Sequence, residues 1–544
     1  MSRVSASIDS PSASQPSVGT HGTPRTLPWV PRVRWVWWFL GLFVANFLAT
    51  LGHGTFSDDE AWFLQVASRV AAGEVLYRDI FYGATPLAVY LAAPFVALSG
   101  AELAVIKGLV ALSATLTLLV VRRILQQLNL GQHFPLIAAA LIVFAPAWMI
   151  GTGALYVPLA YLLLALTLML SLEGNGGLQT SPAGWPNRPA LLSGLAAGLC
   201  FGAHQVVGAL ALLALIGSSA LALSPPGLRV RPRMRGPVMQ LAAFIVSAGA
   251  VLIPVLISGG AAKFVEYGIT AKRLYVETAQ ISYVWGLRVF GKLVSNLAAP
   301  GSARAFYWQL EFLMPILVLV TMGAALLVCR PSRRDPLWIV VFFGAASYLG
   351  GLPRMGIEHL SVTLPILAVG LVYALARLPM RIGLRPARLA RGAFVLALIP
   401  GFAWLYVPPI LGLASGTQQI ATQPHLRGVL LPPQMIEFLD RSARALRDES
   451  DPARTFLLTR SAGLWYALSG MRNPTPFDYP LLTAFGLDGQ VAVRQAIVDG
   501  GITTVCMEPI TGYYLAAREL EAYVQQAMRP GEEVGACRLY HRLP

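Results

Sequence analysis

Residues 56–87 read FSDDEAWFLQVASRVAAGEVLYRDIFYGATPL and follow directly on the first long apolar run of the chain. Asp58, Asp59 and Glu60 stand together where a membrane protein usually has a short, inert loop. The three acids would also suit the positively polarised N-terminus of a helix that begins near Ala61. The stretch by itself therefore leaves two interpretations open, a solvated helix cap and a functional site.

The composition is that of a polytopic membrane protein. Of the 544 residues, 56% are hydrophobic and 12% are charged, whereas about 25% of the residues of a soluble protein are charged. The net charge of +15 could suggest a nucleic-acid partner. Most basic residues, however, stand in short clusters between apolar runs, as the positive-inside rule requires. We therefore attribute the charge to membrane topology and expect no nucleic-acid partner.

Apolar runs of about 17 to 25 residues predict eleven membrane spans, and the Lys and Arg residues between the spans orient the chain. Arg25, Arg32 and Arg34 place the start of the first span in the cytoplasm, so the acidic stretch comes out on the outer face. The predicted spans are 35–51, 103–121, 134–150, 156–172, two runs on either side of His204, 238–257, 306–328, 337–352, 360–376 and a last run that ends near residue 413.

The chain divides into three parts. Residues 1–28 are rich in Ser, Pro, Thr and Gly and predict a disordered cytoplasmic tail. Residues 29–413 form the membrane domain, whose first outer loop, residues 52–102, holds two helices expected to lie on the membrane surface. Residues 414–544 predict a small α/β domain, and an odd number of spans places this domain outside the cell.

In the C-terminal part, apolar residues recur with helical spacing over residues 432–446. Short apolar runs predict strands at 455–459, 503–507 and 536–540, and a second helix is expected near 513–527. The chain has four cysteines, and none has the spacing of a zinc site. Cys506 and Cys537 fall on predicted strands; they could form a disulfide in an oxidising compartment or could simply be buried.

The topology brings the conspicuous polar residues of the chain to one boundary, at the outer face. Ionisable groups beside apolar segments tend to face a cavity, where they pair or take part in function. Singly, each has a structural explanation, such as a hydrogen-bonding histidine or an arginine that reaches toward the interface. Together they predict one outward-facing site. Its residues are Asp58, Asp59, Glu60, Asp79, His204, Gln205, Lys272, Arg273, Arg354, Glu358 and His359, with Tyr82 as a further substrate contact.

A site of this kind suits the transfer of a group from a lipid-borne anionic donor. Arg, Lys and His side chains can hold a phosphate and stabilise the negative charge that develops on it as it leaves. A carboxylate can take a proton from an acceptor hydroxyl that attacks a sugar carbon from the opposite face. This chemistry needs no Walker motif and no dinucleotide-binding glycine pattern, and the sequence contains neither.

The motif DEAWF at 59–63, the phrase AAGEVLYRD at 71–79 and the following Pro-Leu run resemble the C-type (GT-C) glycosyltransferase superfamily. Its most similar members are the protein O-mannosyltransferases and the bacterial lipid A aminoarabinose transferases. The number of spans, the phrase HLSVTLP at 359–365 and the outer C-terminal domain extend the resemblance over most of the chain. Only the first outer loop is specific as a motif.

The resemblance implies a sugar donor on polyprenyl phosphate and an active site at the Asp-Glu pair of the first outer loop. Asp59 and Glu60 match that pair, with Asp59 as the base, and Asp58 is an additional acid. Asp79 matches a frequent second acid of the loop. Many members have a Lys before Pro-Pro-Leu, where this chain has Ala84 and Thr85. His204 with Gln205, Lys272 with Arg273, or Arg354 could replace that Lys as the contact to the donor phosphate.

The sequence thus predicts an inverting glycosyltransferase of EC class 2.4 in a bacterial-type inner membrane. It would move a sugar from a polyprenyl-phosphate carrier to a glycan, lipid or protein acceptor at the outer face. No metal site is predicted, and the participation of a divalent cation stays open. One alternative is a transporter or lipid flippase, which would show inverted repeats and charges at the midplane of the membrane. Another is a non-catalytic assembly partner with the same fold, which the missing Lys would favour.

Overall fold

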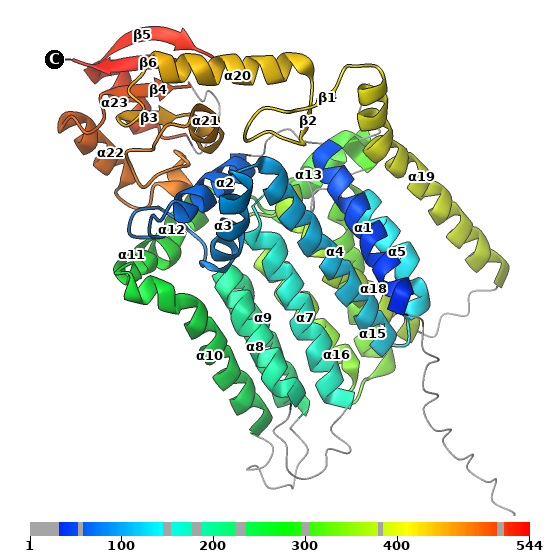
Figure 1. The fold of residues 1–544 in the computed structure, drawn as a ribbon. Helices are drawn as coiled ribbons and strands as arrows, with labels where there is room; N and C mark the ends of the chain where they lie inside the picture. The colour runs from blue at the N-terminus through cyan, green and yellow to red at the C-terminus, as the bar shows by residue number, and fades with distance from the viewer. Residues whose placement is uncertain are drawn as a thin grey trace, which may run out of the picture.

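The computed structural model describes residues 32–52, 58–144, 154–176, 188–222, 235–295, 305–307, 309–378, 384–508 and 516–543. The predicted disordered tail, residues 1–28, lies outside this range. Within it, a bundle of tilted apolar helices carries, at one end, a layer of short helices and the C-terminal sheet (Figure 1).

Apolar helices occur at every predicted span. Within the described ranges, five helices are long and apolar enough to cross a membrane, and seven shorter apolar helices accompany them. The structure is therefore that of a multi-pass membrane protein, and the number of eleven spans stays a prediction. The bundle helices are α1 (Arg32–Gly52), α4 (Leu103–Gln127), α5 (Phe134–Phe144), α7 (Tyr156–Gly176), α8 (Arg188–Ala203), α9 (Gln205–Ala222), α10 (Arg235–Ile257), α15 (Met314–Cys329), α16 (Pro336–Gly350), α18 (Leu364–Arg377) and α19 (Leu384–Ala414).

The first outer loop forms two helices, α2 (Asp58–Ala71) and α3 (Leu87–Ser99), close to the predicted ranges. The expectation that both lie on the membrane surface is wrong for α2, because residues 60–67 of this helix are all buried. The helix α21 (Ala462–Ser469) covers α2 from the side of the C-terminal domain. A Cβ atom on Gly463 would lie 2.6 Å from the Ala61 carbonyl oxygen, so glycine is what allows this close approach.

The segment after α10 folds into α11 (Ala261–Phe264), a π-helical turn at Val265–Thr270, α12 (Lys272–Thr278) and α13 (Tyr283–Ser295). A short helix, α17 (Ile357–Ser361), follows α16, and a 3-10 turn, Leu310–Leu313, precedes α15. Helices α11, α12 and α13 lie at the same end of the bundle as α2 and α3 (Figure 1).

The C-terminal part contains a four-stranded sheet in the order β3-β4-β6-β5. Strands β3 (Thr455–Leu458), β4 (Thr504–Met507) and β6 (Cys537–Arg542) lie at the predicted positions, and β5 (Met528–Val534) was not predicted because its charged residues, Pro530 and Gly531 lack a strand pattern. Strands β3 and β4 are parallel, and β6 pairs antiparallel with both β4 and β5. The accompanying helices are α20 (Pro433–Asp448), α21, α22 (Gly489–Val498) and α23 (Arg518–Ala527), and a small pair, β1 (Gln419–Ile420) and β2 (Leu430–Leu431), precedes them.

Cys506 of β4 and Cys537 of β6 form a disulfide, which is one of the two outcomes that the sequence left open. The bond fastens neighbouring strands of the sheet to each other. Of the other two cysteines, Cys200 is buried in α8 and Cys329, at the end of α15, is partly exposed.

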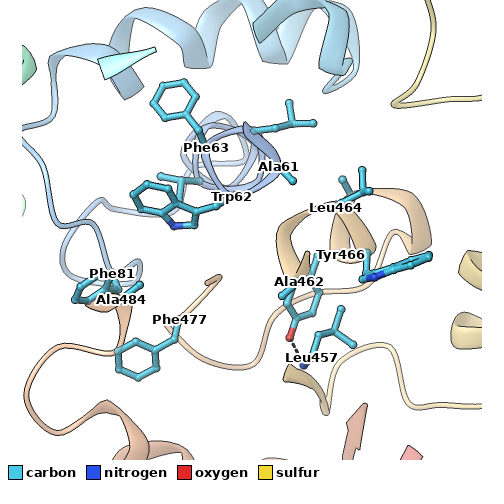
Figure 2. Close-up of a cluster of buried hydrophobic side chains, with 14 of the residues drawn as sticks. Ala61, Trp62, Phe63, Phe81, Leu457, Ala462, Leu464, Tyr466, Phe477 and Ala484 are labelled. Atoms are coloured by element: carbon cyan, nitrogen blue, oxygen red, sulfur yellow. Dashed lines mark hydrogen bonds between the residues drawn. The ribbon is translucent and has the colours of Figure 1, made fainter. Parts of the chain in front are cut away.

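One continuous hydrophobic core joins the first outer loop to the C-terminal domain. Phe63 and Leu64 of α2 belong to the same buried cluster as Phe456 and Leu457 of β3 and Tyr466 of α21. Figure 2 shows this junction, with Ala61 of α2 near Leu464 of α21. A second core fills the membrane bundle. The C-terminal domain is therefore packed onto the first outer loop as part of the same folded unit.

Candidate functional site

Asp59 lies in the first turn of α2, partly buried, where the positively polarised helix end stabilises a carboxylate. Its charge acts on the hydroxyl of Tyr156, the first residue of α7. Arg354 and Tyr275 act on the same hydroxyl. Tyr156 therefore marks the place where an acid of α2 meets groups from two other segments, α12 and the turn after α16. The side chain of Asp58 lies outside the described residues.

Glu60, the neighbour of Asp59, is committed to a different contact. Its carboxylate lies 3.0 Å from the ammonium nitrogen of Lys107 in α4, and both side chains are buried. Lys107 also reaches the Thr50 carbonyl oxygen at 3.4 Å. Burial raises the pKa of the Glu60 carboxyl, and the positive charge of Lys107 opposes this shift. The pair fixes the first turn of α2 against the membrane bundle.

Four basic side chains from three segments gather beside Tyr156. His204, the single residue between α8 and α9, stacks on the Tyr156 ring with 5.8 Å between ring centroids. Lys272 of α12 and His359 of α17 both act electrostatically on His204, and Arg354 acts on His359. The structure therefore brings these four predicted residues into electrostatic contact with one another.

The charge of this cluster comes from its lysine and arginine. Burial, together with Lys272 and His359, lowers the pKa of His204 to about 3. Burial and Arg354 lower the pKa of His359 to about 4, against the opposing effect of Glu358. Burial lowers the pKa of Lys272 to about 8, so this ammonium is still mostly charged at neutral pH. Both histidines are neutral there and can serve as hydrogen-bonding groups.

Lys272 and Arg273 are neighbours in the sequence and have different surroundings. The ammonium of Lys272 lies 3.8 Å from where a Cβ on Gly83 would stand, so it touches the first outer loop. It also lies 5.2 Å from the Tyr275 ring centroid. Arg273 is exposed and pairs with Glu277 at 2.8 Å on the surface of α12. Of the two predicted cations, only Lys272 belongs to the cluster.

Backbone and side-chain hydrogen bonds hold the loops of the site together. The amide of Gln205 donates to the carbonyl oxygens of Gly83 at 3.0 Å and Gly268 at 2.8 Å. The hydroxyl of Thr85 donates to the Phe201 carbonyl oxygen at 2.6 Å. Gln205, predicted as a substrate contact, therefore joins the first outer loop to the segment that carries Lys272.

A second clamp joins the segment after α12 to the turn after α16. The Ile281 amide donates to the Pro353 carbonyl oxygen at 3.1 Å, and the Met355 amide donates to the Ile281 carbonyl oxygen at 2.8 Å. Arg354 lies between these two bonds. The clamp therefore fixes the backbone of Arg354 relative to that of Lys272.

Aromatic rings surround Tyr156 on the side of the first outer loop. The ring centroids of Trp62 and Tyr82 are 5.4 Å apart, and both rings meet Tyr156 edge-on, at 6.4 and 6.3 Å. Tyr479 of the C-terminal domain stacks on Trp62 at 5.8 Å. Burial raises the pKa of the Tyr82 hydroxyl well above its usual range, so this group is protonated.

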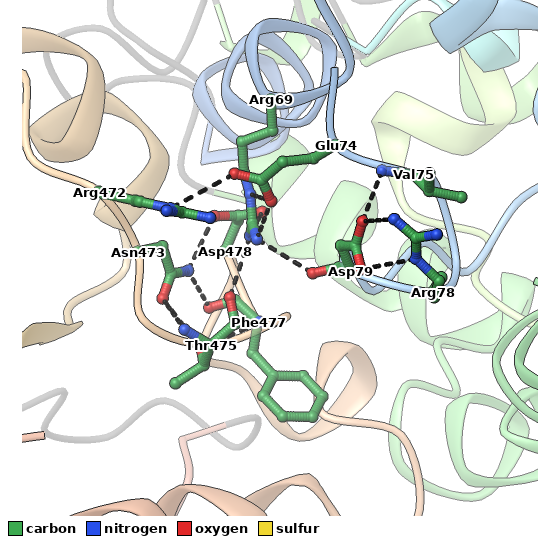
Figure 3. A network of polar contacts seen from close by, with 10 residues as sticks. All are labelled: Arg69, Glu74, Val75, Arg78, Asp79, Arg472, Asn473, Thr475, Phe477 and Asp478. Atoms are coloured by element: carbon green, nitrogen blue, oxygen red, sulfur yellow. Dashed lines mark hydrogen bonds and ion pairs between the residues drawn. The ribbon is translucent and has the colours of Figure 1, made fainter. Parts of the chain in front are cut away.

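Asp79, the predicted second acid, takes part in a structural network (Figure 3). Its carboxylate accepts from the Val75 amide at 2.8 Å and pairs with Arg78 at 2.8 Å. Hydrogen bonding from Arg78 lowers the pKa of the Asp79 carboxyl. These contacts close the turn that follows α2.

The same network docks the C-terminal domain. Arg69 of α2 is buried and donates to Asp478 at 2.8 Å and to Glu74 at 2.6 Å, and it also donates to the Asp79 carbonyl oxygen at 3.0 Å. Asn473 donates to the other Asp478 oxygen at 2.8 Å (Figure 3). Asp478 directly precedes Tyr479, so the ion pair fixes the backbone that places the Tyr479 ring on Trp62.

Glu358 lies at the rim of the cluster and is partly buried. Its carboxylate packs 2.7 Å from where a Cβ on Gly356 would stand. It acts electrostatically on His359 and on Glu311, a buried acid that accepts from Ser361 at 3.3 Å. Glu358 therefore lies where it can orient the imidazole ring of His359.

The sequence did not identify Lys107, Trp62, Tyr156 or Tyr479. Lys107 carried a usable signal, because a single lysine within an apolar run of nineteen residues, 103–121, is expensive in a membrane and implies a partner. The three aromatic residues gave no such signal. An aromatic residue in an apolar segment is explained by core packing just as well as by a role in a site.

Among the residues that the structure describes, no three His, Cys, Asp or Glu side chains lie close enough together to hold a metal ion. The carboxylate of Glu60 is already paired with the ammonium group of Lys107. The question of a divalent cation, left open by the sequence, stays open.

Solved structures share the fold over most of the chain. ArnT from Cupriavidus metallidurans bound to undecaprenyl phosphate matches with a TM-score of 0.59 and 14% identity, over 94% of this chain and 99% of that chain. An Archaeoglobus fulgidus oligosaccharyltransferase in complex with Zn and sulfate matches with a TM-score of 0.52 and 11% identity, over 93% and 73% of the two chains. No protein-family model and no curated protein matches the sequence. The chain therefore shares its fold with these two solved structures.

Proposed function

We propose that this protein is an inverting membrane glycosyltransferase that takes a sugar from a polyprenyl-phosphate donor at the outer face of the membrane. The observation that carries the proposal is the meeting of Asp59 and the basic cluster at Tyr156. An acid and a set of phosphate-binding groups are the two parts that inverting transfer requires, on opposite sides of the sugar carbon.

In this mechanism the Asp59 carboxylate accepts the proton of the acceptor hydroxyl as its oxygen attacks the anomeric carbon. The bond between that carbon and the phosphate oxygen breaks with inversion, and the released polyprenyl phosphate keeps the bonding electron pair. Lys272 and Arg354 stabilise its charge, and neutral His204 and His359 can donate hydrogen bonds to it. Glu60 has the role of a positioning residue, because Lys107 holds its carboxylate.

Lys272 takes the role of the lysine that the first outer loop lacks. Its ammonium comes from another loop and lies next to Gly83, one residue before Ala84. The missing Lys is therefore no argument for a non-catalytic partner. The likeness to a structure that binds undecaprenyl phosphate supports a lipid donor of this kind.

The outer orientation has support in the Cys506–Cys537 disulfide, because such bonds persist in oxidising compartments. A membrane-impermeant maleimide tests it on intact cells. Val491, 63% exposed on α22, is changed to Cys, and the natural Cys329 serves as the control for the opposite face. We expect labelling of Val491→Cys from outside and of Cys329 only after the membrane is opened. The reverse pattern would overturn the orientation.

The catalytic test uses purified protein in detergent with a panel of undecaprenyl-phosphate monosaccharides and a membrane glycan or lipid extract as acceptor. We expect release of undecaprenyl phosphate, and Asp59→Asn should lower its rate by about 10²- to 10⁴-fold. Asp440→Asn, which removes a surface acid of α20, is the matched control. Full activity of a folded Asp59→Asn variant would exclude Asp59 as the base. Uptake of solutes into vesicles without any transfer would favour a transporter.

A further inference from the structure

Trp62, Tyr82, Tyr156 and Tyr479 form one cluster of aromatic rings, and two of them carry hydrogen-bond donors without an acceptor. The indole nitrogen of Trp62 and the hydroxyl of Tyr82 are buried and have no hydrogen-bond partner. Buried donors are nearly always satisfied, so each of these calls for an explanation. Phenylalanine in place of Tyr82 would fill a similar volume without leaving a donor unpaired.

We propose that Trp62, Tyr82, Tyr156 and Tyr479 form the subsite for the sugar ring of the donor, with the Trp62 indole nitrogen and the Tyr82 hydroxyl donating to sugar oxygens. This inference rests on the proposed function. The subsite is the part of the site that selects the sugar, and it includes Tyr479 of the C-terminal domain.

The chemistry of the ligand follows from the two donors. An isoprenoid chain has no acceptor oxygen and could not satisfy them. The phosphate has its own partners in Lys272 and Arg354. A monosaccharide presents oxygens around its edge and C–H groups on its faces, which suit donors at the floor of the subsite and aromatic rings at its sides.

The position of the rings indicates that the subsite holds the sugar of the donor and not the acceptor. Tyr156 contacts Trp62, Tyr82 and His204, and Asp59 acts on its hydroxyl. The rings therefore adjoin both the base and the phosphate-binding groups. In an inverting reaction the sugar carbon lies between the attacking hydroxyl and the leaving phosphate. The rings are at the corresponding position, next to the base and to the phosphate-binding groups.

Tyr156 and Tyr479 are the more accessible of the four rings. Trp62 and Tyr82 are 7% and 0% exposed and form the floor, whereas Tyr156 and Tyr479 are only partly buried. Tyr479 stacks on Trp62 and also packs, with Tyr275, against a small cluster of Ala279, Leu481 and Ala516. A sugar that reaches the two donors therefore has to shift the outer rings, and the C-terminal domain supplies one of them.

Binding of lipids to the full-length protein in detergent tests the inference. The probes are bare undecaprenyl phosphate and undecaprenyl phosphate carrying glucose, mannose, galactose, arabinose or 4-aminoarabinose. We expect wild type to bind at least one sugar-bearing lipid about tenfold more tightly than the bare lipid. Tyr82→Phe and Trp62→Phe should each reduce that ratio by about fivefold. Both should leave the affinity for bare lipid unchanged, and Tyr82→Phe should leave the melting temperature equal or higher.

Tyr77→Phe is the matched control, because Tyr77 is equally buried and its hydroxyl donates to the Ala84 carbonyl oxygen at 2.5 Å. This variant should lower the melting temperature and keep the ratio. The subsite is excluded if no sugar increases affinity, if Tyr82→Phe keeps the ratio, or if it weakens binding of the bare lipid. Absence of any binding of bare undecaprenyl phosphate to wild type would instead refute the proposed function.

Discussion

Lys107 and Glu60 form a buried ion pair, 3.0 Å between ammonium nitrogen and carboxylate oxygen, that fixes the acid-bearing turn of α2 to the membrane helix α4. Asp59 occupies the same turn and acts on Tyr156 instead. Two adjacent acids therefore have separate roles, one that holds the turn in place and one that faces the site.

The pair predicts a clear order of stabilities. Lys107→Met leaves the Glu60 carboxylate buried without its partner and should lower the free energy of unfolding by about 3 to 5 kcal/mol. The double variant Glu60→Gln/Lys107→Met should recover much of this loss, because neither charge remains. Thermal unfolding in detergent measures Glu60→Gln, Lys107→Met and the double variant. If the double variant loses as much stability as the two single variants together, the two residues stabilise the protein independently.

Lys272 and Arg273 provide a matched comparison. Lys272→Met removes a cation from the site and should reduce transfer by about 10²- to 10³-fold. Arg273→Met removes a surface cation paired with Glu277 and should change transfer by less than about twofold. The measurement is the initial rate with a polyprenyl-phosphate sugar. A greater loss in Arg273→Met would place the phosphate elsewhere.

The pH dependence of kcat/KM should show an alkaline decline near pH 8. The pKa of Lys272 is lowered to about 8 by burial, so the ammonium is charged below that pH and loses its charge as the pH rises through it. Binding of the anionic donor to the free enzyme then weakens. Lys272→Arg should remove the decline, because arginine does not titrate in this range. The two histidines, with pKa values of about 3 and 4, contribute none of it.

Docking of the C-terminal domain should depend on Arg69. Arg69→Met leaves Asp478 buried and unpaired, a loss of about 3 to 5 kcal/mol, and should make the segment before α20 sensitive to limited proteolysis. Arg472→Met serves as the control, since Arg472 is 77% exposed and lies 3.8 Å from Glu74. Identical digestion of both variants would mean that the apolar core alone holds the domain.

The disulfide should be intact in protein from the membrane and should stabilise the C-terminal sheet. It spans 31 residues, and the double variant Cys506→Ser/Cys537→Ser should lose about 3 to 4 kcal/mol of stability. Reductant should destabilise wild type by a similar amount and leave the double variant unchanged. Two free thiols at these positions, detected by mass spectrometry, would argue against an outer location.

The sequence predicted the fold well because hydropathy and the spacing of basic residues determine where helices enter a membrane. The DEAWF motif then gave a resemblance whose expected fold agrees with the solved structures that match. The separate roles of adjacent residues were not predictable. Lys272 and Arg273 differ because neighbours on a helix point about 100° apart, and only the packing of α12 decides which of them faces Gly83.

Contacts between distant segments were also out of reach. The partner of Glu60 is 47 positions away and the partner of Arg69 is 409 positions away. A single sequence contains no pattern that links such positions. Asp79 was assigned to the site because the acid matches a familiar motif, whereas its contacts with Val75 and Arg78 close a turn.

The core shared by α2 and β3 has a consequence for biogenesis. Phe63 emerges from the ribosome early, and Leu457, a member of the same core, follows roughly 400 residues later. During synthesis, the side of α2 that α21 later covers has no intramolecular cover. Membrane insertion and completion of this core are thus separated in time, and a nascent chain that stops after α19 would leave that side of α2 uncovered and aggregation-prone.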